Sequence, residues 1–88
     1  MKVLVLYRPN SDHGRIVEDF IRDYQRAGHS GTIEALNLDS REGAAMASLY
    51  DVVQYPSIII VRQDGSALRA WQGRELPLQS EVAAYAYS

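Results

Sequence analysis

Cysteine is absent from the 88 residues of this chain. Without a thiol the chain forms no disulfide, offers no thiolate nucleophile and binds no metal through sulfur. Thiol–disulfide chemistry by the chain itself is therefore excluded from the outset.

The chain also lacks a charge excess and a long apolar run. Its 9 basic and 11 acidic residues are interspersed and give a net charge of −2, so we expect no nucleic-acid partner. The apolar run at 3–7 is too short for a signal peptide or a membrane span. We therefore expect a cytoplasmic protein without membrane contact. The length and the hydrophobic fraction of 47% predict one globular domain over 1–88.

The most informative stretch runs from Tyr50 to Val61. Here Pro56 and Ser57 lead directly into Ile58-Ile59-Ile60-Val61. A short apolar run rich in β-branched residues indicates a strand that is covered on both faces. Proline has no N–H to donate, so we place Pro56 at the beginning of that strand.

Before this stretch, the pattern predicts two strands and two helices. A strand over 2–7 ends at Pro9, and Asn10 or Ser11 caps a helix that ends at Gly28. The apolar stripe of this helix consists of Ile16, Val17, Phe20, Ile21 and Tyr24. A second strand covers 32–39. The stretch 39–42 resembles a capping box, with Asp39 as the cap of a short helix that reaches Tyr50.

After this stretch, the pattern predicts a hairpin and a last helix. The third strand covers 57–62, the turn signal Gln63-Asp64-Gly65-Ser66 follows, and the fourth strand covers 67–72. Pro77 suits the first turn of a final helix with Leu78, Val82 and Tyr85 on one face. The predicted order is β-α-β-α-β-β-α, an α/β arrangement with a right-handed crossover between the first two strands.

The segment from Tyr50 through Tyr55-Pro56-Ser57, followed by a hydrophobic strand and an Asp-Gly turn, resembles the cis-proline segment of the thioredoxin family. The stretches Leu36-Asn37-Leu38-Asp39 and Trp71-Gln72-Gly73 are similar to the ends of the family's second and last strands. The resemblance implies a thioredoxin-like or glutaredoxin-like fold. Its mixed sheet would have four strands in the order 2-1-3-4, flanked by three helices.

The family carries Cys-x-x-Cys where this chain has Ser11-Asp12-His13-Gly14. The resemblance therefore implies a redox-inactive member, and we assign no catalytic residue. One alternative is an enzyme that uses Ser11 with glutathione or another thiol, as in serine-type glutathione transferases. Ser11 as a simple helix cap is the competing interpretation. Asp12 favours the interpretation of Ser11 as a cap, because its carboxylate already interacts favourably with the helix dipole and would repel a thiolate.

Metal binding is not expected at this turn. His13 and Asp12 are too few ligands for a metal site. His13 is also not expected to act as a general base for Ser11, because residues two apart on a helix do not face each other. We interpret His13 as an exposed residue of the first helical turn. No metal and no cofactor is expected.

In the thioredoxin family, the residue before the cis-proline offers its backbone to an extended peptide or to glutathione by antiparallel pairing. An aromatic–proline bond is easily held cis. We therefore expect a surface, called here the cis-proline groove, bounded by Ser11, Asp12, His13, Gly14, Tyr55, Pro56 and Ser57. The expected function is a small binding or adaptor module for a protein or extended peptide, with glutathione as a weaker candidate.

A third hypothesis is a structural protein that dimerises through an exposed sheet edge. Trp71, with Arg69 and Arg74 nearby, would form an interface there, or Trp71 would instead pack beneath the last helix against Tyr85. The sequence is compatible with a monomer or a weak homodimer.

Overall fold

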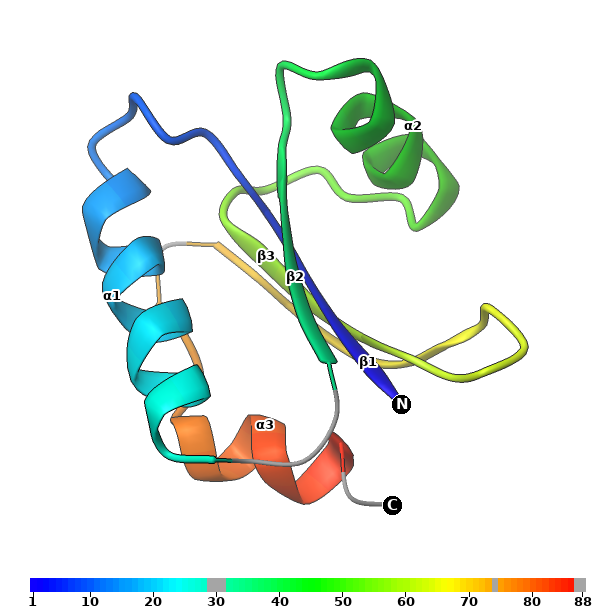
Figure 1. Cartoon of the computed structure of the whole chain (residues 1–88). Helices are drawn as coiled ribbons and strands as arrows, with labels where there is room; N and C mark the ends of the chain where they lie inside the picture. The colour runs from blue at the N-terminus through cyan, green and yellow to red at the C-terminus, as the bar shows by residue number, and fades with distance from the viewer. Residues whose placement is uncertain (29–31, 74, 87–88) are drawn as a thin grey trace.

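The computed structural model describes residues 1–28, 32–73 and 75–86 (Figure 1). Its elements follow the predicted order: β1 (Lys2–Tyr7), α1 (Gly14–Arg26), β2 (Thr32–Asn37), α2 (Arg41–Leu49), β3 (Ser57–Val61), β4 (Ala67–Gln72) and α3 (Gln79–Ala86).

The four strands form one mixed sheet in the order β2-β1-β3-β4, which confirms the predicted order 2-1-3-4. β1 runs parallel to β2, with Tyr7 opposite Asn37, and antiparallel to β3, with Leu6 opposite Ser57. β3 and β4 form the predicted antiparallel hairpin. The central strands β1 and β3 are therefore paired on both sides, and β2 and β4 are the edges.

The two faces of the sheet carry two apolar clusters, because successive side chains of a strand point to opposite faces. Cluster A joins one face of β1 and β3 to α1 and α3; it contains Val3, Val5, Tyr7, Val17, Phe20, Tyr24, Ile58, Ile60, Val82, Ala83 and Ala86. Cluster B joins the other face to α2; it contains Leu4, Leu6, Leu38, Ala47, Val52, Ile59 and Val61. In Figure 1, α2 accordingly lies apart from α1 and α3.

The beginning of α1 differs from the prediction. The helix starts at Gly14, three residues after Ser11, and its N-cap is His13, which makes no side-chain capping bond. The Ser11 N–H instead donates to the Arg8 carbonyl at 3.2 Å and closes a turn. The prediction that Asn10 or Ser11 caps the helix was wrong, because this additional turn separates the strand from the helix.

The beginning of α2 also differs. β2 ends at Asn37 and the N-cap is Ser40, whose hydroxyl accepts the Gly43 N–H at 3.0 Å. Asp39 instead forms an ion pair with Arg8, Nε to Oδ1 at 3.1 Å. The predicted capping box centred on Asp39 was wrong, because a tertiary ion pair takes its carboxylate.

Side-chain burial corrects the predicted helix faces. Ile16 is 59% exposed and Leu78 is 68% exposed, although both were assigned to apolar stripes. Leu78 precedes α3, whose buried residues are Val82, Ala83 and Ala86. Ile21 is half-buried against cluster A.

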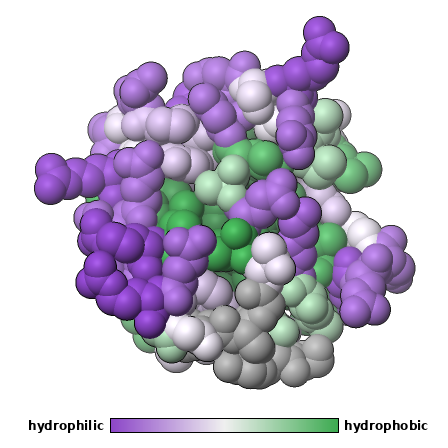
Figure 2. Space-filling view, in the orientation of Figure 1, coloured by the Kyte–Doolittle hydropathy of each residue, from purple (hydrophilic) through white to green (hydrophobic). Residues whose placement is uncertain are grey.

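The edge strand β2 brings apolar side chains to the surface. Ile33 packs against cluster A and Leu36 against cluster B, and both are half-buried. Figure 2 shows apolar surface in the middle of this view, surrounded by hydrophilic side chains.

In the part of the chain that the structure describes, no helix has the length and apolar character that crossing a membrane requires.

Candidate functional site

The turn after β1 is held by hydrogen bonds to Arg8. The Ser11 hydroxyl donates to the Arg8 carbonyl at 2.6 Å, and the Arg8 N–H donates to Nε2 of His13 at 3.2 Å. The His13 side chain is only 16% exposed, so the interpretation of His13 as an exposed residue was wrong.

Gly14 brings the first turn of α1 against the preceding turn. A Cβ at this position would overlap the carbonyl group of Pro9. The close approach therefore requires glycine, and it fixes where α1 starts relative to the end of β1. This contact places Asp12 and His13 at the rim of the site.

A second segment, 53–56, approaches this turn from β3. The Tyr55–Pro56 peptide bond is cis. The side-chain oxygen of Gln72, at the end of β4, accepts the N–H groups of Val53 and Gln54 at 3.0 and 3.2 Å. The Gly73 N–H donates to the Pro56 carbonyl at 3.0 Å. The end of β4 thus holds this segment on both sides of Tyr55.

The Tyr55 backbone is free of internal pairing among the described residues. Within residues 1–28, 32–73 and 75–86, neither its N–H nor its C=O has a hydrogen-bond partner. Its ring packs against cluster B, and the guanidinium carbon of Arg8 lies 5.2 Å from the ring centre. An unpaired backbone N–H and C=O are what main-chain pairing with an extended ligand uses.

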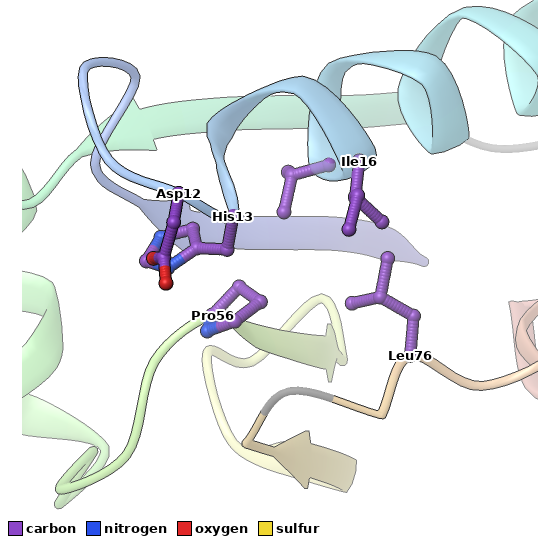
Figure 3. Close-up of a pocket in the computed structure, with 6 residues that line it drawn as sticks. Asp12, His13, Ile16, Pro56 and Leu76 are labelled. Carbon is purple, nitrogen blue, oxygen red and sulfur yellow. The ribbon is translucent and has the colours of Figure 1, made fainter.

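A cavity of about 140 Å³ lies between the turn and the segment; it is lined by Asp12, His13, Ile16, Val17, Pro56 and Leu76. Figure 3 shows His13 and Asp12 beside Pro56 at one end and Ile16 opposite Leu76 at the other. Ile16, Val17, Pro56 and Leu76 are the apolar residues of the lining, and Asp12 and His13 are the polar ones.

The structure thus brings three of the expected groove residues, Asp12, His13 and Pro56, to one cavity. Ser11, Gly14, Tyr55 and Ser57 lie beside the cavity in sequence but do not line it. Sequence reasoning did not include Ile16, Val17 and Leu76. The helical stripe would have suggested the first two, whereas Leu76 lies in a connection without periodicity.

Ser57 is buried completely rather than presented to the groove. Over the described residues, its hydroxyl has no hydrogen-bond partner. It lies in β3 opposite Leu6 and Gln72, on the face of the sheet that carries cluster B. Its side chain therefore belongs to the interior.

One titratable group ties the sheet to α1 near this site. The Tyr7 hydroxyl donates to Oε2 of Glu18 at 3.1 Å. Burial raises the pKa of Tyr7, and the hydrogen bond to Glu18 and its negative charge raise it further. Among the described residues, no group of three or more His, Asp or Glu side chains is placed to hold a metal ion.

Trp71 packs beneath the last helix against Tyr85, which was the second of the two alternatives for this residue. Its ring meets that of Tyr85 edge-on at 5.7 Å, and Arg69 lies over both rings at 5.1 and 5.7 Å. Trp71 is half-buried beneath α3 against cluster A. Arg74 lies outside the described residues.

Comparison with known proteins finds similarity at the level of structure. No protein-family model and no curated protein matches the chain. A solved structure described as that of a malarial protein superposes with a TM-score of 0.73 at 17% identity, covering 94% of this chain and 89% of that one. Thioredoxin 1 from Thermosipho africanus superposes with a TM-score of 0.68 at 15% identity, covering 96% and 88%. The chain therefore has the thioredoxin-like fold, and it has it without cysteine.

Proposed function

We propose that this chain is a redox-inactive binding module that holds an extended peptide in the cis-proline groove. The observation that carries the proposal is the unpaired backbone of Tyr55 beside the cavity lined by Ile16, Pro56 and Leu76. Backbone pairing at Tyr55 would supply affinity, and the cavity would take one apolar side chain of the ligand.

The alternative enzyme that uses Ser11 receives less support. The Ser11 hydroxyl donates its proton to the Arg8 carbonyl, and His13 accepts from the Arg8 N–H rather than from Ser11. A serine nucleophile needs a base within hydrogen-bonding reach. The edge-dimer alternative is likewise weakened, because Trp71 packs on Tyr85 within the chain.

The proposal is tested by an amide-resolved NMR titration with a panel of extended peptides and with reduced glutathione. Saturable shifts at 11–14 and at the amides of Tyr55 and Ser57 are expected for peptides. An absence of shifts at these amides at millimolar peptide would reject the proposal. Saturable shifts with glutathione alone would replace the peptide by a small thiol as the ligand.

A charged side chain that lines the cavity should weaken peptide binding. Ile16 is 59% exposed, so Ile16→Arg should leave the free energy of unfolding nearly unchanged while its guanidinium obstructs the cavity. The expected result is a peptide Kd at least about tenfold weaker. Leu49→Arg is the matched control, because Leu49 is 64% exposed on α2 and does not line the cavity. Equal binding by the two variants would contradict the assignment of the site.

A further inference from the structure

A second cleft, of about 360 Å³, lies on the opposite face of the sheet from the cavity of the cis-proline groove. Arg8, Leu38, Ala44, Ser48, Val52 and Tyr55 are among its lining residues. Tyr55 and Val52 belong to the side of cluster B, whereas Val17 of the first cavity belongs to cluster A. The Tyr55–Pro56 step thus separates the two, with Tyr55 lining one and Pro56 the other.

The second cleft is lined by an arginine, Arg8, whereas the first cavity is not. Nε of Arg8 is occupied by Asp39 at 3.1 Å, and the guanidinium rests over the Tyr55 ring. The two terminal nitrogens of the Arg8 guanidinium have no hydrogen-bond acceptor in the described part of the chain, since the ion pair with Asp39 uses Nε. The Arg8 side chain is 47% exposed, so a ligand can reach these donors. A carboxylate accepts from a guanidinium fork through charge-assisted hydrogen bonds.

Antiparallel pairing at Tyr55 determines which ligand residue would meet which cleft. In an antiparallel pair, directly opposite side chains point to the same face, and adjacent side chains alternate. A ligand residue opposite Tyr55 would therefore point toward Arg8. The residue before it would lie opposite Pro56 and point into the first cavity. That cavity, about 140 Å³, is close to the size that holds a benzene ring, so it suits one leucine-sized side chain.

We infer that the bound peptide carries, in chain direction, an apolar residue followed by an acidic residue, which occupy the two clefts on either side of the Tyr55–Pro56 step. This inference rests on the proposed function, because it specifies side chains of the peptide proposed there. Asp39 already offers a negative charge beside Arg8, and the competing occupant, a basic residue, is therefore tested explicitly.

The experiment compares three capped hexapeptides by NMR titration of the intact chain: Thr-Thr-Leu-Glu-Thr-Thr, the reversed step Thr-Thr-Glu-Leu-Thr-Thr, and Thr-Thr-Leu-Lys-Thr-Thr. The Leu-Glu peptide should bind about tenfold more tightly than either of the others, the advantage that one charge-assisted hydrogen bond supplies. Arg8→Met keeps an unbranched stem without the guanidinium and should remove this advantage. Arg15→Met, an exposed arginine of α1, is the matched control and should preserve it.

The outcomes separate the two proposals. Equal affinities for the three peptides, with shifts at Tyr55, would overturn the side-chain inference and leave groove binding intact. Tighter binding of the Leu-Lys peptide would also overturn it and would assign the second cleft to Asp39. The absence of shifts with every peptide would reject groove binding itself.

Discussion

At the scale of single residues, Gly14 determines how the site is assembled. It is the first residue of α1 and lies against the Pro9 carbonyl. Any side chain there must push the helix away from the turn that carries Asp12 and His13. Gly43, the third residue of α2, makes a similar contact, because a Cβ there would overlap the Asn37 carbonyl. The first turn of each of these two helices therefore makes a close approach that only glycine permits.

Gly14→Ala should lower the free energy of unfolding by about 1–3 kcal/mol, as overpacking commonly does. The physical reason is that backbone rather than a flexible side chain receives the added methyl group. Urea unfolding followed by circular dichroism measures the change. Arg15→Ala is the control, since Arg15 is exposed on the same turn and should change stability by less than about 0.5 kcal/mol. Equal stability of Gly14→Ala and the wild type would mean that the turn shifts to accommodate the methyl group with no loss in the free energy of unfolding.

At the scale of elements, β4 positions a segment that it does not contain. Gln72 accepts two N–H groups of the 53–54 segment, and the neighbouring Gly73 donates to Pro56. The orientation of Tyr55 in the groove therefore depends on the end of the hairpin. This connection makes Gln72 a positioning residue for the proposed peptide site.

Gln72→Leu should remove the acceptor for both N–H groups and cost about 1 kcal/mol of stability, the net value of an ordinary hydrogen bond. Hydrogen exchange should become faster at the amides of Val53 and Gln54, and peptide affinity should fall. Gln72→Glu keeps an oxygen acceptor at the same reach and should retain slow exchange. If the leucine variant kept slow exchange as well, the loop would be held by its own packing, and Gln72 would have no positioning role.

At the scale of the whole molecule, one partly buried hydroxyl, that of Tyr7, links stability to alkaline pH. The pKa of Tyr7 is raised above its ordinary value of about 10, first by burial and then by Glu18. The folded state thus holds this proton more tightly than the unfolded state. The resulting stability is fully present below about pH 10 and is lost as the pH rises through the folded pKa.

The free energy of unfolding should therefore fall between about pH 9 and about pH 12, the range in which tyrosine titrates. Tyr7→Phe removes the titrating group and should flatten this part of the curve, although it also loses the bond to Glu18 at 3.1 Å. Urea titrations at closely spaced pH values measure both slopes. An unaltered alkaline slope in the phenylalanine variant would assign the loss of stability to other groups.

Periodicity and turn chemistry were sufficient for the order of helices and strands along the chain. The β-branched run at 58–61 identified a buried strand, and the Asp64-Gly65 turn identified the hairpin. The spatial order β2-β1-β3-β4, which the structure confirms, came instead from the resemblance to the thioredoxin family. Local capping was predicted less well, at Ser11 and at Asp39. In both cases Arg8 decided the outcome, through its carbonyl for Ser11 and its guanidinium for Asp39. The Ser11 bond closes a local turn within three residues, whereas Asp39 lies 31 residues from Arg8, and a partner that distant in sequence leaves no local pattern.

The amino-acid sequence alone establishes the absence of thiol chemistry, since no arrangement of a chain without cysteine supplies a thiolate. It also establishes the short continuous apolar runs that are typical of strands buried on both faces, as β1 and β3 are. Only the tertiary structure placed Leu76 opposite Ile16, left the Tyr55 backbone unpaired among the described residues, and put two unlike clefts on either side of the Tyr55–Pro56 step. These features depend on segments that are far apart in sequence and that the sheet brings close together. The side-chain pattern within one segment does not indicate such contacts.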